Sequence, residues 1–389
     1  MNIDVSIASP GEHSLISEVK NGLTIDLDDP THSMEIIHKE HQKLAFLGII
    51  GTDDSTVELA TLAAQALNLI HNPPYSAKLT QRKDLARTRL AEKHCAVPFH
   101  LLINLSNNLE NLVKDVVWPC VIKPLNMSAS RGVIRVNNIT DFLIACDRVG
   151  KIIANADDPF ERSHLLLEKY IDGQEVAFEA YMKNGELHPL AMFDKPNPLV
   201  GPYFEETIYV TPSQLDSSIQ KQIQQRVLEA CQAYGLVTGP IHAELRIDNN
   251  SECWILEIAN RSIGGDCGRT LDGPTEFFIE KLIISLAIGK PPPVSKTLHA
   301  HGVMMIPIDK AGVLQKIEGI EEAKKTTAIT HLKMNINPGN ELIPLPEGNQ
   351  YLGYIFAESE TPQQVVEALN SAYSKLSFKL SPKIDLHQL

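Results

Sequence analysis

Two short apolar runs joined by a tight turn constrain the fold of this sequence more than any other feature. The runs 240–247 and 253–259 are separated by the turn signal at 248–250, and this pattern predicts an antiparallel hairpin. Each predicted strand contains one glutamate, Glu244 or Glu257, and the hairpin length places the two carboxylates near one another. Two close carboxylates repel unless a cation lies between them, and oxygen ligands beside phosphates favour Mg²⁺. The hairpin therefore indicates either a magnesium site or two glutamates satisfied at the rim of a sheet.

Polar residues around the hairpin extend this candidate site. Side chains alternate between the two faces of a strand, so His242 and Glu244 share a face. Arg261 follows the second strand, directly before the glycine-containing turn 262–265. A planar guanidinium in that position suits a carboxylate or a transferred phosphoryl group. The alternative is an ordinary surface arginine.

A second candidate segment combines a lysine with a loop of small residues. The strand 116–125 delivers Lys123, the loop 126–132 is rich in small residues, and another strand follows at 132–136. Small loop residues let backbone N–H groups approach an anion, and a lysine supplies a point charge for phosphate. The segment predicts a phosphate site, although a lysine near a strand end is often only solvated.

A third segment has the pattern of a strand edge that could contact a nucleoside. An apolar strand over 165–169 ends in the polar sequence 168–171, the chain turns at Asp172 and Gly173, and a new strand begins at Glu175. An exposed backbone edge here could contact a purine, and Glu175 could accept hydrogen bonds from ribose hydroxyls. A plain hairpin with charged corners is the alternative.

Strand and helix patterns alternate at the start of the chain, which predicts a parallel α/β arrangement. The predicted N-terminal strands are 5–9, 23–27 and 44–51, and the predicted helices are 10–20, 31–42 and 55–68. Linkers are predicted at 71–74 and at the proline run 291–293. Helices are predicted at 80–94, with Thr80 as its cap, and at 213–234, and a final helix at 362–376. These features predict regions 1–79, 80–292 and 293–389.

Composition excludes several classes of protein. Lys and Arg total 35 against 48 Asp and Glu, and a net charge of −13 disfavours a nucleic-acid partner. No apolar run approaches the roughly 20 residues of a membrane span. The six cysteines show no CxxC spacing, so neither a zinc site nor a disulfide framework is indicated, and reduced thiols in the cytoplasm are the simplest interpretation.

The candidate segments occur in the order that marks the ATP-grasp superfamily, and the chain resembles its carboxylate–amine ligases, which include L-amino-acid (dipeptide) ligases. The matching segments are 71–74 with 82–84, 121–133, 168–175, 239–244, 257–265 and 302–354. The resemblance implies an α/β and α+β protein with an ATP-grasp fold, a shortened N-terminal Rossmann-like domain and a small C-terminal α+β domain.

The resemblance also implies roles for individual residues. ATP would be bound at three places. The phosphates would contact Lys83, Lys123, Ser128, Ser130, Arg131 and Gly132. The adenine would contact Glu168, Lys169, Tyr170 and Ile171, and the ribose would contact Glu175. Mg²⁺, or Mn²⁺, would be held by Glu244, Glu257 and Asn260, and the catalytic groups would be Arg261, Glu206 and His242. The family often has asparagine where this chain has Ala259; Asn260 points to the opposite face from Glu257 unless a β-bulge re-aims it.

Glu206 distinguishes between the ligases of this superfamily. Biotin carboxylases share the nucleotide site and place a lysine for bicarbonate on the strand before the long helix, where this chain has Glu206 or, one residue earlier, Glu205. A carboxylate repels bicarbonate but can hold an ammonium group. The expected function is amide formation through an acyl phosphate, with small carboxylate and amine substrates, and a homodimer is common among related proteins. A bicarbonate-using enzyme and a catalytically weakened nucleotide-binding protein are the alternatives.

Overall fold

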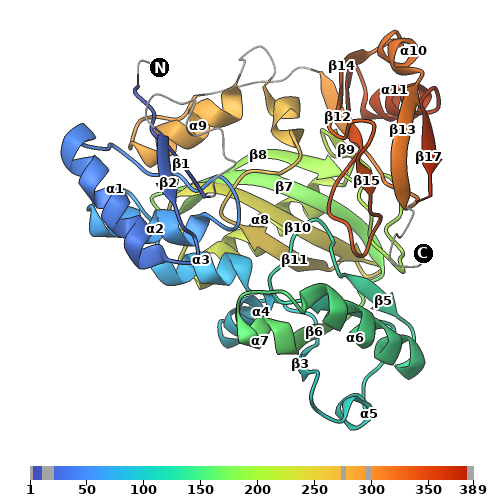
Figure 1. Ribbon diagram of the computed structural model, residues 1–389, viewed down its shortest axis with the longest axis horizontal. Helices are drawn as coiled ribbons and strands as arrows, with labels where there is room; N and C mark the ends of the chain where they lie inside the picture. The colour runs from blue at the N-terminus through green and yellow to red at the C-terminus, as the bar shows by residue number, and fades with distance from the viewer. Residues whose placement is uncertain (1–2, 11–21, 273–276, 294–298, 383–389) are drawn as a thin grey trace, which may run out of the picture.

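An eight-stranded sheet runs through the middle of the molecule, in the order β11-β10-β7-β8-β9-β12-β16-β14 (Figure 1). The computed structural model describes residues 3–10, 22–272, 277–293 and 299–382. The strands are β7 (Gly173–Lys183), β8 (Glu186–Asp194), β9 (Ile208–Thr211), β10 (Gly239–Asp248), β11 (Cys253–Ala259), β12 (Ala300–Ile306), β14 (Ile329–Met334) and β16 (Gly353–Ser359). All neighbouring strands in this sheet are antiparallel, so the predicted hairpin over 240–259 is confirmed as β10 and β11.

Helices cover the large sheet because each presents an apolar stripe to it. The helix α8 (Ser217–Tyr234) buries Ile223 and Val227 in a core that also contains Phe178 of β7 and Leu245 of β10. The helices α9 (Phe278–Ala287) and α11 (Pro362–Tyr373) pack at other parts of the sheet, and a 3₁₀ turn, η2, spans Cys267–Leu271. No helix among the described residues is long and apolar enough to cross a membrane.

A smaller sheet of order β3-β6-β4-β5 lies beside the large one, at the bottom of the view in Figure 1. Its strands are β3 (His100–Asn104), β4 (Cys120–Pro124), β5 (Ile134–Val136) and β6 (His164–Lys169), and its helices are α5 (Leu109–Leu112), α6 (Ile139–Ile153) and α7 (Pro159–Ser163). Buried side chains of α6, including Phe142 and Val149, pack on the apolar face of this sheet. The strand–loop–strand unit predicted around Lys123 is confirmed as β4, its loop and β5.

The N-terminal segment contains one parallel strand pair, β1 (Ile7–Pro10) with β2 (Gly22–Ile25), followed by helices. The helices are α1 (Pro30–Leu44), α2 (Val57–Ala66), α3 (Pro74–Gln81) and α4 (Lys83–Glu92). The predicted helix over 10–20 lies outside the described residues, apart from Pro10 in β1. Predicted parallel pairing is thus observed for these two strands.

Two sequence predictions in this segment are wrong. The run 44–51 forms no strand: Leu44 and Leu47 are 46% and 64% exposed, so its apolar side chains are not a buried strand core. The helix predicted over 80–94 is interrupted at Arg82, whose extended backbone (ψ 104°) separates α3 from α4. Thr80 lies inside α3, where its hydroxyl donates to the Ala77 carbonyl, and does not cap a helix.

The C-terminal segment extends the large sheet and adds a small one. Strands β12, β14 and β16 belong to the eight-stranded sheet, and β12 pairs directly with β9. The unpredicted strands β13 (Gly312–Glu318), β15 (Glu341–Leu342) and β17 (Ser377–Ser381) form a three-stranded sheet beside α10 (Ile320–Lys324). The predicted start of α11 is confirmed, because Thr361 and Gln364 form a capping box and Pro362 occupies the first turn.

Candidate active site

The two glutamates of the hairpin face one another across β10 and β11. Glu244 and Glu257 are register partners, and a β-bulge follows Glu244. Residues directly opposite in an antiparallel pair have side chains on the same face. Their side chains are 22% and 24% exposed, so both carboxylates retain access to solvent. Two accessible carboxylates on one face fit a hard divalent cation such as Mg²⁺.

The third predicted metal ligand, Asn260, makes different contacts. Its side-chain oxygen accepts from Asn72 at 2.7 Å, and its amide donates to the Pro240 carbonyl at 2.9 Å. Asn72 also accepts from the backbone N–H groups of Val237 and Thr238. Asn260 therefore anchors the predicted linker to the start of β10, and its oxygen is already engaged.

The two predicted phosphate lysines lie close to acidic partners. Lys83, at the start of α4, is 3.3 Å from Glu257 and donates to the Met127 carbonyl at 2.8 Å. Lys123 on β4 contacts Glu168, which also pairs with Arg87 at 2.6 Å between nitrogen and oxygen. The structure thus brings Lys83 to Glu257 of the hairpin and to the loop that follows Lys123.

Glu168 is the anion of a buried ion cluster. Burial by itself would raise its pKa, but Arg87 and Lys123 together lower the pKa of Glu168 to about 2. The Glu168 carboxylate therefore orients Lys123. The sequence had instead predicted that Glu168 contacts the adenine. Sequence reasoning missed Arg87, although its spacing from Lys83 on α4 places both on one helix face.

The loop between β4 and β5 has a backbone that favours small residues. Ala129 and Ser130 have φ values of 53° and 55°, and Gly132 has φ 71°. A Cβ on Gly132 would lie 2.7 Å from Pro124 Cγ, which explains the glycine there. Ser128 accepts from the Arg131 backbone N–H at 3.2 Å, so the predicted phosphate residues form one compact turn.

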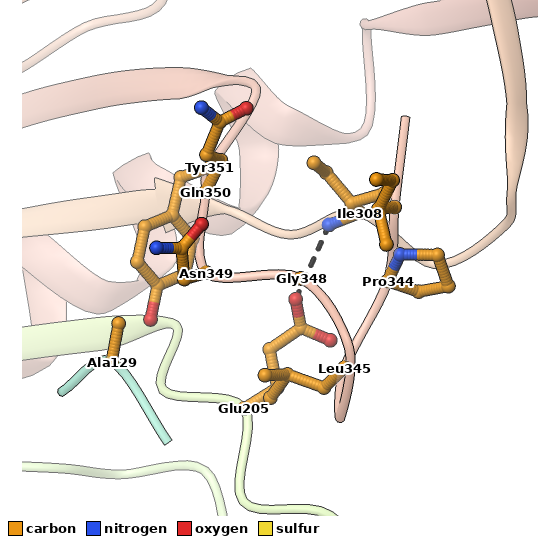
Figure 2. Close-up of a pocket in the computed structure, with 10 residues that line it drawn as sticks. Ala129, Glu205, Ile308, Pro344, Leu345, Gly348, Asn349, Gln350 and Tyr351 are labelled. Carbon is orange, nitrogen blue, oxygen red and sulfur yellow. Dashed lines mark hydrogen bonds between the residues drawn. The ribbon is translucent and has the colours of Figure 1, made fainter. Parts of the chain in front are cut away.

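A loop of the C-terminal segment, residues 344–350, rests on the predicted phosphate loop, residues 126–132. The Gly132 N–H donates to the Pro346 carbonyl at 2.9 Å, and Arg131 Nε donates to the Glu347 carbonyl at 3.0 Å. The Glu347 carboxylate accepts two hydrogen bonds from Arg148 on α6, at 2.6 and 2.9 Å. In Figure 2, Ala129 lines the same small pocket as Asn349 and Tyr351. The C-terminal segment therefore fixes the position of the phosphate loop.

Replacing Glu347 with glutamine is expected to loosen the phosphate loop. A partly exposed bidentate pair contributes about 1 kcal/mol, so the KM for ATP should rise about 5-fold. Steady-state kinetics of ATP turnover measure this change. Asp147→Asn, which removes an exposed surface pair on the same helix α6, is the control and should leave the KM unchanged. An unaltered KM for ATP in Glu347→Gln would show that the contact does not hold the loop.

The predicted adenine and ribose residues lie together at the junction of β6 and β7. The backbone N–H groups of Lys169 and Tyr170 donate to Phe99 and Pro119 at 2.9 and 3.1 Å. The Ile171 carbonyl accepts from Arg246 at 2.9 Å. The first two hydrogen bonds lie within the smaller sheet, and the contact of Ile171 with Arg246 on β10 connects the two sheets.

Glu175 lies beside two cationic side chains, Lys195 and Arg246. It accepts from Lys195 at 2.7 Å and from Arg246 at 2.8 Å. Lys195, which follows β8, also contacts Glu206 and lies 3.3 Å from Glu244. Burial would lower the pKa of Lys195, but the three carboxylates raise it well above its usual value. Sequence reasoning missed Lys195, because a lysine directly after a strand is usually solvated.

The two glutamates before β9, Glu205 and Glu206, make different contacts. Glu206 accepts from the Tyr209 hydroxyl at 2.6 Å and joins the Lys195 cluster. Burial and repulsion by Glu244 raise the pKa of Glu206 to about 7. Glu205 instead accepts from the Ile308 backbone N–H at 3.2 Å (Figure 2). The structure thus brings Glu206, and not Glu205, to Glu244.

His242 lies between Glu179 and Glu244. Its Nδ1 contacts Glu179, and its Nε2 lies 3.6 Å from Glu244 Oε1. The other oxygen of Glu179 accepts from the Ile263 N–H at 3.1 Å, in the turn after β11. Burial would lower the pKa of His242, but Glu179 and Glu244 raise it to about 9. His242 therefore connects Glu244 to the turn that follows Arg261.

Arg261 is held by the N-terminal segment. Its Nε and Nη2 donate to the two Asp54 oxygens at 2.7 and 2.9 Å, and its Nη1 donates to the Ser262 carbonyl at 3.1 Å. Asp54 lies in the loop before α2 and gave no signal in the sequence, because the two residues are far apart in the chain. The guanidinium is thereby fixed beside the acidic hairpin.

Comparisons with known proteins identify two domains of the chain. Residues 116–270 match the ATP-grasp domain, and residues 304–381 match the L-amino acid ligase C-terminal domain 2. Over 167 residues the chain is 26% identical to the alanine–anticapsin ligase of Bacillus amyloliquefaciens, a match that covers 39% of this chain. The match spans 35% of that ligase, so this chain accounts for about a third of the length of the relative.

Solved structures agree on the fold. The crystal structure of an L-amino acid ligase from Bacillus licheniformis has a TM-score of 0.80 and 24% identity, covering 92% of this chain and 88% of that one. A biotin carboxylase from Campylobacter jejuni has a TM-score of 0.67 and 14% identity, covering 96% and 86%.

Residues 116–270 match the ATP-grasp domain, and the fold of the chain agrees with that match, as the sequence predicted. More particularly, its ATP-grasp domain is followed by the C-terminal domain of L-amino acid ligases, so the resemblance found in the sequence is confirmed.

Proposed function

We propose that this protein is an ATP- and magnesium-dependent ligase that joins a carboxylate and an amine, with amino-acid-like substrates. The observation that carries the proposal is Glu206, a carboxylate that contacts Lys195 close to the hairpin glutamate Glu244. An acidic group attracts an ammonium and repels bicarbonate. The matched C-terminal domain and the alanine–anticapsin ligases support amino-acid substrates. The proposed regions are 1–79, 80–292 for nucleotide binding and catalysis, and 293–389.

The first step would transfer the γ-phosphoryl group of ATP to the substrate carboxylate, giving an acyl phosphate and ADP. One anion attacks another, so the site must neutralise charge. Lys83 and Lys123 would contact the phosphates, and Arg261 would stabilise the acyl phosphate. Mg²⁺ bound by Glu244 and Glu257 would supply further positive charge to the phosphate oxygens. We leave Asn260 out of this ligand set, because its oxygen accepts from Asn72.

The second step would form the amide. The substrate ammonium would bind the Glu206 carboxylate and lose a proton to it, which the raised pKa of Glu206 favours. The free amine would attack the acyl carbon, and inorganic phosphate would leave. No covalent bond to the protein is needed at either step.

A phosphate-release screen with purified protein and magnesium–ATP tests the proposal. Pairs of amino acids should stimulate phosphate release, and mass spectrometry should detect the amide product. Release that depends on bicarbonate without any amino acid would instead indicate a carboxylase-type enzyme, in keeping with the biotin-carboxylase fold. ATP binding without turnover for all substrates would contradict the ligase.

Glu206→Gln tests the amine site specifically. Loss of a charged hydrogen-bond partner costs about 1.5–3 kcal/mol, so the KM for the amine substrate should rise roughly 10- to 100-fold. The KM for ATP should change little by comparison. Glu205→Gln is the matched control, since a glutamine oxygen can still accept from the Ile308 N–H. Equal effects of the two substitutions would contradict the assignment.

A further inference from the structure

Lys195 lies between three carboxylates that come from different parts of the large sheet. Its side chain is 3% exposed, and its Nζ is 2.7 Å from Glu175 on β7 and 3.3 Å from Glu244 on β10. It also contacts Glu206, which precedes β9, and lies 4.9 Å from the centre of the Tyr209 ring. A single buried ammonium thus joins three acidic side chains.

The geometry of the three carboxylates resembles that of a metal site. One oxygen each from Glu175, Glu206 and Glu244 lies within 4.8 Å of the others. Oxygens at this spacing are ligands that a divalent cation accepts. Their mutual repulsion requires a cation among them, and in this structure the cation is the Lys195 ammonium.

Each of the other cationic groups near the cluster contacts one of its three carboxylates. Arg246 pairs with the second oxygen of Glu175 at 2.8 Å. His242 lies 3.6 Å from Glu244 and contacts Glu179 more closely. Among the described residues, Lys195 is therefore the cation that contacts all three carboxylates.

We propose that Lys195 is a positioning residue that holds the place of a cation among Glu175, Glu206 and Glu244. Its ammonium keeps these carboxylates together in the arrangement that nucleotide, amine and metal need. The inference rests on the proposed function for the roles of the three glutamates. The Lys195 ammonium occupies the position that a divalent cation would take among these three carboxylates. Binding of a metal ion at this site would therefore depend on the phosphates of the bound nucleotide.

The proposal makes a prediction that needs no ligase turnover. Without the ammonium, three carboxylates remain at ligand spacing, so Lys195→Met should bind Mn²⁺ in the absence of nucleotide at least ~10-fold more tightly than the native protein. Electron paramagnetic resonance of free Mn²⁺, titrated with the full chain, measures this affinity. Lys195→Arg keeps the charge and should behave as the native protein does.

Two further variants control the experiment. Lys183→Met, at the opposite end of β7, removes a lysine outside the cluster and should not change Mn²⁺ affinity. Lys195→Met combined with Glu206→Gln removes one ligand and should lose the gain. Because removal of the ammonium leaves repelling carboxylates, Lys195→Met should also unfold at a lower temperature, and Mn²⁺ should restore the midpoint.

The outcomes separate this inference from the proposed function. Unchanged Mn²⁺ affinity in folded Lys195→Met, or a failure of Mn²⁺ to stabilise that variant, would overturn the inference even if the native protein ligates amino acids. A gain in Mn²⁺ affinity that the double variant loses would support it even if the phosphate-release screen finds no amino-acid substrate.

Discussion

Glu257→Gln is expected to reduce ATP turnover at least about 1,000-fold, since it removes one anionic ligand proposed for Mg²⁺ and leaves Lys83 without its carboxylate partner. The transition state for phosphoryl transfer carries charge that the site must neutralise, so the loss should appear mainly in kcat. Phosphate release from purified protein measures it. Circular dichroism should show an intact fold, because the Glu257 side chain is 24% exposed.

Glu252→Gln is the matched control for this experiment. Glu252 precedes the same strand β11, is exposed, and contacts Arg226 at 3.4 Å on the protein surface. Its substitution should leave turnover within about 2-fold, because exposed pairs contribute little. Near-native activity of Glu257→Gln would refute the metal assignment of the hairpin.

Glu168→Gln should cause the largest loss of stability among the changes considered. The carboxylate neutralises the buried cations Arg87 and Lys123, and removing one partner of a buried ion pair costs about 3–5 kcal/mol. Thermal and denaturant unfolding measure the loss. Glu92→Gln removes an exposed partner of Arg89 on α4 and should change stability by less than about 1 kcal/mol.

The effect of Glu168 should also depend on pH. Its pKa is lowered to about 2 in the folded protein, against about 4.3 in an unfolded chain. The carboxylate therefore contributes its full stabilisation above about pH 4.3 and loses it as the pH falls toward 2. The difference in unfolding free energy between native protein and Glu168→Gln should shrink over that range. A constant difference from pH 7 to pH 3 would contradict the low pKa.

Local patterns predicted the parts of the site that lie close together in the sequence. The hairpin that pairs Glu244 with Glu257 follows from two apolar runs and a turn, and the phosphate loop follows from a lysine and small residues between strands. The sequence also places Glu206 near the start of a strand, but register alone did not separate it from Glu205. The hydrogen bond from Ile308 makes that distinction in the structure.

Contacts between distant segments could not be predicted in the same way. Asp54 meets Arg261, Arg87 meets Glu168, and Lys195 meets Glu244 only after the sheets and helices have packed. The run 44–51 shows the opposite error: its apolar residues have the composition of a strand, but no neighbouring strand pairs with them in the described structure. Apolar sequence indicates a possible core, whereas long-range packing decides which runs enter it.

The pairing of β9 with β12 bears on how such proteins can be recombined. A chimaera joined at the predicted linker 291–293 would attach a foreign β12 to the native β9 in the interior of a sheet, where backbone hydrogen bonds and the packing of Tyr209 against Val303 must both match. Exchanging Ile208–Thr211 together with Ala300–Ser359 keeps these partners from one parent. Crossovers that keep paired strands from the same parent should therefore yield folded hybrids, whereas crossovers at the predicted linker should not.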